Sequence, residues 1–332
     1  MAGMGWLEIT VATLLIIALL ARAGIRMPGR SYRGPLPPLD SHETGVCRRL
    51  RRHVEVLAGE IGERHVWNAG SLDRAACYIE DQLRSAGLAV DVQAFTVRGV
   101  EVRNVIGALG PDDDSAEHIV IGAHYDSVVG TVGANDNASG VAALIEVARA
   151  TATLAPRLPI RSVAFVNEEP PFFLTGDMGS RRYARSLVER GIRVRAMLSL
   201  ETLGCYTDRP LSQSYPIPLG LLYPRTGNFI AVVGNLRSRR LVRNCVRSFR
   251  THTRFPCEGA ALPGYLPGVF WSDHWAFWRE GYPAAMVTDT ALFRYGYYHL
   301  PGDTPEKLDY ARLARVVTGL ARVVADLSGR AR

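Results

Sequence analysis

The feature that most constrains the fold is an alternation of apolar runs of strand length with segments of helical spacing. Runs typical of strands span 89–97, 104–110, 118–127, 161–167 and 194–202, and segments typical of helices span 43–60, 71–86, 139–155, 179–191 and 310–328. Ser180 is expected to cap the fourth helix. Strands that alternate with helices predict an α/β fold, with a mostly parallel, mixed central sheet and helices on both faces.

Three segments divide the chain. Residues 1–26 form an N-terminal hydrophobic segment, residues 27–42 form a linker rich in Pro, Gly and Arg, and residues 43–330 form one large domain. With 47% hydrophobic and 21% charged residues, a chain of 332 residues can bury a substantial core.

The N-terminal segment gives two conflicting signals. The uncharged run 9–21 is short for a spanning helix, which needs about 20 apolar residues. Ala21 and Ala23 are placed like a signal-peptide cleavage site. Four arginines follow the run and none precedes it, which by the positive-inside rule retains the C-terminal side in the cytoplasm. We expect membrane association through this segment, or export, and leave the side of the membrane open.

The basic charge is carried almost entirely by arginine. The net charge is +7 and Lys307 is the only lysine. The arginine clusters at 47–52, 180–185 and 236–243 have helical apolar spacing and are interpreted as solvated helix faces. They match no nucleic-acid module, so no nucleic-acid partner is expected. Five scattered cysteines without a CxxC pair predict neither a disulfide framework nor a thiolate zinc site.

Two adjacent carboxylates, Glu168 and Glu169, stand at the end of the predicted strand 161–167 with no cation beside them. Two buried carboxylates repel each other, and burial is costly unless they are paired or bind a metal. Taken alone, the pair is more typical of a solvated strand end than of a site. The stretches 205–228 and 255–268 are rich in Pro, Gly and Tyr and are expected to be long ordered loops.

Further chemical groups fall where strands end. His124 and Asp126 end one strand, Asp136 precedes a helix, Glu201 ends another strand, and His299 comes late in the chain. Side chains at the carboxyl ends of strands collect in the crevice where α/β proteins bind ligands. Imidazole and carboxylate without thiolate suit catalytic zinc, with cobalt or manganese not excluded.

The chain resembles the M28 zinc aminopeptidases, a branch that also holds the glutaminyl cyclases. The resemblance covers roughly residues 45–330 and is carried, in order, by "HYDSVVGTVGANDNASG" (124–140), "NEEPPFF" (167–173), "LSLETLGCY" (198–206), "SDHWAFW" (272–278) and "YHLPGDTPEKLDY" (298–310). It implies the phosphorylase/hydrolase-like zinc peptidase fold, with residues 43–330 as the catalytic domain. The implied reaction is removal of the N-terminal residue from peptides.

The resemblance also implies two zinc ions bridged by Asp136, although one is possible. His124 and Glu201 would complete one metal site, and Glu169 and His299 the other. The implied roles of the remaining two residues are Glu168 as the general base and Asp126 as the partner that orients the imidazole of His124.

Three departures from the family pattern affect the site. Asn135 precedes the bridging aspartate where many members have a second aspartate, and Glu201 stands where many have Asp. The stretch 170–180 is longer than the usual Gly-rich turn, which places the preferred substrate side chain in doubt. The family similarity makes Asp273, His274 and Tyr298 candidates for substrate binding, although each is equally typical of a residue that holds a loop or packs in the core.

Three alternatives stay open at this point. A glutaminyl-cyclase-like transferase would need one zinc and would cyclise N-terminal Gln, and a non-catalytic binding domain would have lost ligands. A carboxypeptidase would need a cationic anchor for the substrate carboxylate, for which Arg294 is a candidate. The expected partners are peptides with a free N-terminus.

Overall fold

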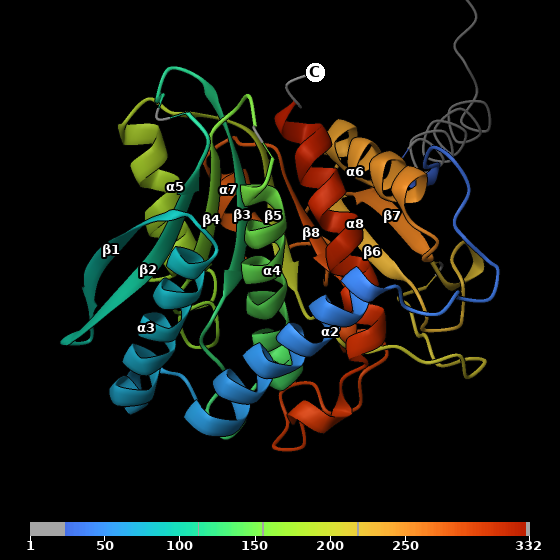
Figure 1. The fold of residues 1–332 in the computed structure, drawn as a ribbon, viewed down its shortest axis with the longest axis horizontal. Coiled ribbons are helices and arrows are strands. Elements are labelled where there is room, and N and C mark those ends of the chain that lie inside the picture. The colour runs from blue at the N-terminus through green and yellow to red at the C-terminus, as the bar shows by residue number, and fades with distance from the viewer. Residues whose placement is uncertain (1–23, 112, 155, 218, 330–332) are drawn as a thin grey trace, which may run out of the picture.

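A computed structural model describes residues 24–111, 113–154, 156–217 and 219–329 (Figure 1). The strands are β1 Ala89–Val97, β2 Val100–Leu109, β3 Glu117–His124, β4 Ile160–Phe165, β5 Arg193–Glu201, β6 Ile230–Asn235, β7 Cys257–Leu262 and β8 Ala284–Thr288. The α-helices are α2 Ser41–Val54, α3 Ala69–Ser85, α4 Gly140–Ala152, α5 Gly179–Glu189, α6 Arg239–His252, α7 His274–Arg279 and α8 Tyr310–Ser328. Short helical turns are η1 Glu55–Ile61, η2 Val66–Asn68, η3 Ala134–Ser139, η4 Leu219–Leu221, η5 Ala291–Phe293 and η6 Pro305–Lys307.

The strands form one mixed sheet in the order β1-β2-β4-β3-β5-β8-β6-β7. Strands β4, β3, β5 and β8 run parallel, so their carboxyl ends share one edge of the sheet. Strand β6 is antiparallel to β8 and parallel to β7. The carboxyl ends of β6 and β7 therefore lie at the opposite edge.

Helices cover both faces of the sheet, so the predicted fold class is confirmed. The larger apolar core joins one face to α2, α3, α4, α6 and α8, which lie in front of the sheet in Figure 1. The smaller core joins the other face to α5 and α7. Strand β3 lies at the centre of the sheet and is buried almost throughout, as expected for a strand covered on both faces.

Two local predictions were wrong. The stretch 255–268 is not wholly loop, because it contains β7. The small residues of β7 gave no clear strand pattern, but its Gly259 is needed, because a Cβ there would lie 2.7 Å from Val246 Cγ2. Ser180 is not an N-cap. Helix α5 is capped by Met178, and Ser180 lies buried inside the first turn.

Residues 24–31, which we call the N-terminal strap, pack along the outer edge of β7. The amide of Cys257 donates to Ser31 Oγ at 3.0 Å, and Arg250 Nη1 donates to the carbonyl of Pro28 at 3.0 Å. Arg243 donates to the carbonyl of Arg26. The strap thereby covers the edge strand of the sheet, which would otherwise present free backbone groups.

The predicted hydrophobic run 9–21 lies outside the described residues. Among the helices that are described, none is both long and apolar enough to cross a bilayer.

Candidate metal centre

Asp136 lies between two sets of metal-ligand side chains. Its Oδ1 is 3.3 Å from His124 Nε2, and its Oδ2 is 3.0 Å from His299 Nε2. Glu201 Oε2 lies 3.3 Å from His124 Nε2, and Glu169 Oε2 lies 3.5 Å from His299 Nε2. Each set therefore combines one imidazole, one glutamate and one oxygen of Asp136. The structure brings together all five side chains that the sequence nominated as ligands.

These ligand atoms are buried without ordinary partners. His124 Nε2, both carboxylate oxygens of Asp136, Glu169 Oε1 and His299 Nε2 have no hydrogen-bond partner in the described part of the chain. Ligand atoms of His124, Asp136 and Glu169 all lie within 4.8 Å of one another. Leaving buried polar atoms unpaired is costly, whereas a divalent cation would satisfy nitrogen and oxygen donors together. The residues present fit zinc.

The fold explains why these residues meet. His124 is the last residue of β3 and Glu201 the last of β5, so both lie at the edge where the parallel strands end. Asp136 lies in η3, which leads into α4. Glu169 follows β4, and His299 comes from the loop before α8. Five separate segments of the chain therefore converge on the carboxyl edge of the sheet, as the sequence predicted.

The paired glutamates are turned into the site by a local break in the strand. Asn167 adopts a left-handed conformation, with φ of 60°. Asp126 Oδ1 then accepts the amide of Glu168 at 3.1 Å, and its Oδ2 accepts the amide of Glu169 at 3.0 Å. The same carboxylate lies 3.5 Å from His124 Nδ1. Asp126 therefore positions the glutamate pair as well as the histidine, a role that spacing alone did not reveal.

Glu168 differs from the ligands in its placement. Its Oε2 lies 3.9 Å from His124 Nε2, farther than the oxygens of Asp136 and Glu201. Its side chain is 9% exposed, so a substrate can reach it. Burial raises the pKa of Glu168 well above its usual range, and the nearby Glu201 raises it further although His124 opposes. A carboxyl with a pKa raised in this way holds its proton more readily than an ordinary glutamate.

Burial and neighbouring charges shift the pKa values of the ligand side chains in different directions. Burial raises the pKa of Glu169 well above its usual range, and Asp136 and Glu168 add to the rise. Burial also acts to raise the pKa of Asp136, but the contacts with His124 and His299 outweigh it, and the pKa of Asp136 is lowered. Burial acts to lower the pKa of His124, yet Glu201 and Glu168 raise it well above its usual value. So many carboxylates ionise together only if a cation compensates them.

Asp303 was not nominated from the sequence, although it lies in the quoted motif "YHLPGDT". It is fully buried, and its carboxylate accepts the amides of Asn135 at 2.8 Å and Asp136 at 3.0 Å. The hydroxyl of Tyr295 donates to the same carboxylate at 2.8 Å. Burial raises the pKa of Asp303 to about 6. Asp303 therefore fixes the backbone that carries the bridging carboxylate.

Asn135, one of the departures from the family pattern, holds the same loop in place. Its side-chain amide donates to Asp289 Oδ2 at 3.0 Å, and its carbonyl oxygen accepts the amide of Gly204 at 2.8 Å. These bonds need a donor and an acceptor on one side chain, which Asn supplies and an ionised Asp does not. The departure at 135 is therefore compatible with an intact metal centre.

Ser272 is a second residue that the sequence did not single out. Its hydroxyl donates to Glu201 Oε2 at 2.8 Å and lies 2.7 Å from Ser199 Oγ. Burial raises the pKa of Glu201. The longer side chain of Glu201 still reaches His124, and Ser272 fixes its orientation. Ser272 is the first residue of the motif "SDHWAFW", in which only Asp273 and His274 were nominated from the sequence.

The three candidate substrate residues have different surroundings. Tyr298 stacks on His299, with ring centroids 3.9 Å apart, and lines a pocket beside the centre. Asp273 is fully buried, neither carboxylate oxygen has a hydrogen-bond partner among the described residues, and burial raises its pKa to about 7. His274 Nε2 bonds the carbonyl of Val269 at 2.8 Å, and its ring packs on Trp278. His274 thus holds a loop, and of the three only Tyr298 lines the pocket.

An apolar pocket opens from the metal centre, with Glu201 and Tyr298 at its near end. It contains about 890 Å³ of space that opens to solvent. Its floor consists of alternate residues of three strands, namely Ala231 and Val233 of β6, Glu258, Ala260 and Leu262 of β7, and Met286 and Thr288 of β8. Its walls include Tyr215, Leu219, Tyr223, Val269 and Phe293. Glu258 pairs with Arg250 at 3.1 Å.

Known proteins share both this sequence and this fold. The profile of Peptidase family M28 matches residues 104–324. The chain belongs to peptidase family M28. Uncharacterized protein YfbL of Escherichia coli (strain K12) is 39% identical over 281 residues, covering 82% of this chain and 85% of that protein. Leupeptin-inactivating enzyme 1 of Streptomyces exfoliatus is 30% identical over 188 residues, covering 55% of this chain and 40% of that enzyme.

Solved structures of the family's fold superpose over most of the chain. A zinc aminopeptidase from Bacillus subtilis has a TM-score of 0.67 at 16% identity, covering 84% of this chain and 94% of its own. A glutaminyl cyclase from Bacteroides thetaiotaomicron has a TM-score of 0.63 at 19% identity, covering 88% of this chain and 99% of its own. At these identities the likeness shows the fold. The M28 chain is thus a hydrolase of a zinc-dependent peptidase family, and the resemblance predicted from its motifs is confirmed.

Proposed function

We propose that this M28 protein is an aminopeptidase that removes the N-terminal residue from peptides with the help of two zinc ions. The observation that carries the proposal is the position of Asp136, whose two oxygens face two different histidines, each accompanied by its own glutamate. A bridging carboxylate of this kind is what a pair of metal ions requires. A site for one metal would not require the second histidine and glutamate, His299 and Glu169.

The residues have distinct tasks in this proposal. His124, Glu201, Glu169 and His299 would hold the metals, and Asp136 would serve both. Zinc bound there supplies Lewis-acid polarisation of the scissile carbonyl and acidifies water. Glu168 takes the proton from the attacking water and passes it to the amine that leaves. Glu168 lies beside the ligands with a partly exposed side chain, which suits a group that exchanges protons with water and substrate.

A free N-terminus fits this site electrostatically. The centre contains Glu168, Glu169, Glu201 and Asp136 within a buried region, and such a concentration of carboxylates favours a cationic amine over a blocked one. Among the described residues that line the adjoining pocket there is no Lys or Arg.

Arg294 does not provide the carboxylate anchor that a carboxypeptidase needs. Its Nε donates to Gln213 Oε1 at 2.7 Å, and its Nη1 donates to the carbonyl of Phe229 at 2.9 Å. The guanidinium also stacks over the Phe229 ring. Arg294 therefore holds the loop 205–228 in place and is not a pocket residue. These contacts favour the aminopeptidase over the carboxypeptidase.

The apolar pocket indicates which N-terminal residues are preferred. It begins at Glu201 and Tyr298, where the first side chain of a bound peptide would enter, and its lining is mainly aliphatic and aromatic. Burying a large apolar side chain is worth about 1.5–3 kcal/mol. Leu or Phe at the N-terminus is therefore expected to be cleaved about 10- to 100-fold more efficiently than Gly.

A panel of matched substrates tests the proposal. Leucyl, phenylalanyl and glycyl amides are compared with N-acetyl-leucyl amide and with a Gln-initiated peptide, using zinc-loaded enzyme and Glu168→Gln as the matched control. Cleavage of the free leucyl and phenylalanyl amides alone supports the proposal. Cyclisation of the Gln peptide without hydrolysis would establish the cyclase instead. Cleavage of the acetylated amide at the same rate would remove the requirement for a free amine.

A further inference from the structure

The segments of the chain beside β7 form a basic surface. Residues 236–257 include seven arginines and residues 22–39 include four, and neither range contains Asp or Glu. We define the basic surface as Arg26 of the N-terminal strap together with Arg237, Arg239, Arg240, Arg243 and Arg247 in and before α6. Arg243 contacts the carbonyl of Arg26, which joins the two parts.

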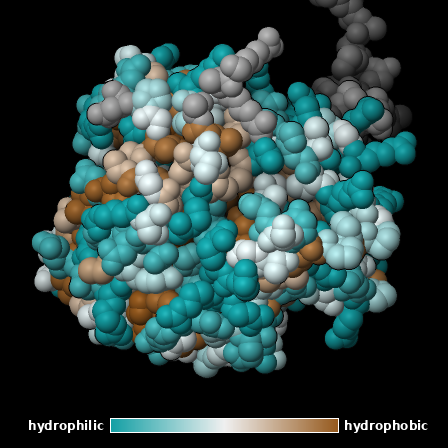
Figure 2. Space-filling model, viewed as in Figure 1, coloured by the Kyte–Doolittle hydropathy of each residue, from teal (hydrophilic) through white to brown (hydrophobic). Residues whose placement is uncertain are grey.

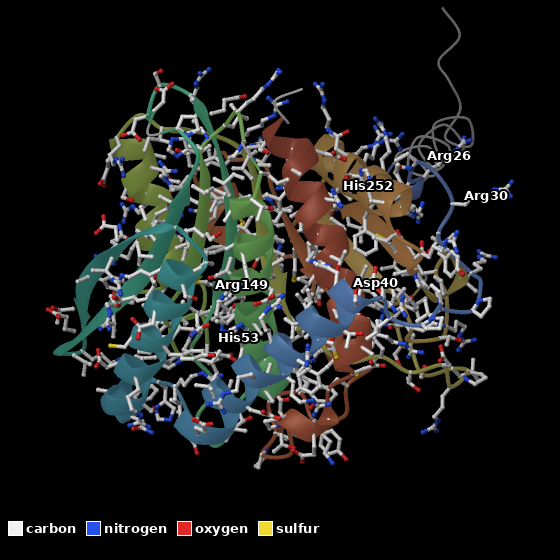
Figure 3. The ribbon with its side chains drawn as sticks, in the orientation of Figure 1. Arg26, Arg30, Asp40, His53, Arg149 and His252 are labelled. Atoms are coloured by element: carbon white, nitrogen blue, oxygen red, sulfur yellow. The ribbon has the colours of Figure 1, made fainter. Side chains whose placement is uncertain are left out.

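Helix α6 presents three of these side chains on its outer face. Leu241, Val242, Cys245, Val246 and Phe249 are buried against the sheet and α8. Arg240, Arg243 and Arg247 are spaced three and four residues apart and share the opposite face. Arg26 lies beside the helix, and the flank that carries both is mainly hydrophilic (Figures 2 and 3).

All the arginines of this surface lack an ion pair among the described residues. Within the described ranges, none of its six arginines forms an ion pair, although many other arginines do. The paired set includes Arg49, Arg52, Arg84, Arg103, Arg149, Arg181, Arg182, Arg190, Arg195, Arg312 and Arg315. Other arginines without an ion pair in the described part of the chain, such as Arg48 and Arg185, lie on separate helices, whereas the six of the basic surface gather on one helix and the segments beside it.

The position of two arginines is also unfavourable for the helix itself. Arg239 and Arg240 occupy the first turn of α6, which contains no acidic residue. The N-terminus of a helix carries partial positive charge, so cations there reduce helix stability and an anion would restore it. An anionic partner that approaches this end of α6 would offset that cost.

The chain's own N-terminus identifies the partner. The apolar run 9–21 is separated from Gly24 by Arg22 and Ala23 alone. Gly24 lies against the carbonyl of Ala261 at the end of β7, and exposed Leu236 is close by. The apolar run is therefore joined to the domain beside the basic surface. Apolar segments with adjacent clusters of Arg are typical of chains that bind anionic membranes.

We infer that the basic surface docks on the anionic headgroups of a lipid bilayer. The carboxyl ends of β6 and β7 lie at the sheet edge opposite the one that carries His124 and Glu201. Docking through Arg237, Arg239 and Arg240, which follow β6, therefore leaves the metal centre facing away from the lipid. A peptide in solution reaches the pocket while the domain is docked.

Binding of the full chain to lipid vesicles tests this inference. Vesicles of phosphatidylcholine are compared with vesicles that also contain phosphatidylglycerol, for wild type, Arg237→Gln/Arg240→Gln and the control Arg48→Gln/Arg185→Gln. Arg48 and Arg185 are equally exposed, lie on α2 and α5, and have no ion pair among the described residues. Urea unfolding verifies that each variant is folded.

Each arginine at an anionic surface contributes about fivefold to binding, so the test pair is expected to weaken binding to anionic vesicles about 25-fold. The control pair is expected to change it less than threefold, and binding to neutral vesicles is expected to stay the same for all three proteins. If the test variant and the control variant lost the same amount of binding, net charge alone would explain the effect and the inference would be overturned. Unchanged binding in both variants would also overturn it.

Hydrogen exchange resolves the case in which the apolar run alone holds the chain on both kinds of vesicle. Slower exchange in residues 236–243 on anionic than on neutral vesicles supports docking, and equal exchange overturns it. A DNA duplex provides the last comparison. Tighter binding to DNA than to anionic vesicles, lost in the Arg237→Gln/Arg240→Gln variant, would assign the surface to nucleic acid instead of lipid.

Discussion

Replacing Asp303 with Asn is the change that most directly separates the metal ligands from the backbone that presents them. The carboxylate accepts three hydrogen bonds, from the amides of Asn135 and Asp136 and from the Tyr295 hydroxyl. The Asn oxygen can replace Oδ1, which serves Asn135 and Tyr295. The NH₂ group of the new Asn then faces the backbone amide of Asp136, and because both groups are donors, that hydrogen bond is lost.

The magnitude follows from the bond that is lost. A hydrogen bond to a charged acceptor contributes about 1.5–3 kcal/mol. If that loss falls on the loop that carries Asp136, zinc affinity falls about 10- to 200-fold, because 1.4 kcal/mol is a factor of ten. Both metals are affected, since Asp136 faces both histidines.

Competition with a fluorescent zinc chelator measures this affinity. Asp309→Asn is the matched control, because Asp309 caps α8 by accepting the amide of Arg312 and Asn caps a helix equally well. The control is expected to bind zinc as wild type does. Wild-type affinity for both metals in Asp303→Asn would refute the role given to Asp303.

Three further predictions concern the centre. Glu168→Gln is expected to lower kcat at least about 100-fold with the zinc content unchanged, because the base is lost and the ligands stay; a kcat near that of wild type would contradict this. Ser272→Ala is expected to weaken zinc about 10- to 100-fold at the Glu201 site alone, so stepwise chelation should remove one metal early, and two metals lost together would argue against it. In metal-free protein, Glu168, Glu169, Glu201 and His124 all have raised pKa values, so the folded state holds protons that the unfolded state has released. Stability is therefore expected to fall as pH rises above the ordinary pKa of glutamate, about 4.3, and a thermal midpoint that rises instead would contradict the sign.

Much of the fold could be predicted because the spacing of apolar residues along the sequence reflects which positions are buried. The predicted helix 310–328 coincides with α8, and the predicted strand 89–97 coincides with β1. Strands β6, β7 and β8 escaped prediction because they are five or six residues long and lie among Pro, Gly and aromatic residues. What makes Cys257–Leu262 a strand is its pairing with β6 and the cover of the N-terminal strap, and both contacts are distant in sequence.

The candidate ligands could be nominated from the sequence because strand ends meet at one edge of an α/β sheet. Their supports could not, because each acts on backbone far along the chain. Asp303 holds amides 167 and 168 positions away, and Ser272 reaches Glu201 across 71 positions. For His274, the sequence left open whether it binds substrate or holds a loop, and its bond to the carbonyl of Val269 favours the second.

The count of zinc ions per chain, in wild type and in Asp136→Ala, tests the central claim most directly. Elemental analysis of protein equilibrated with zinc and freed of excess is expected to give about two zinc per chain for wild type and close to none for the variant, because both metals share Asp136. Glu168→Gln, the matched control, is expected to keep about two. One zinc in wild type, or an unchanged count in Asp136→Ala, would contradict a centre built around a bridging aspartate.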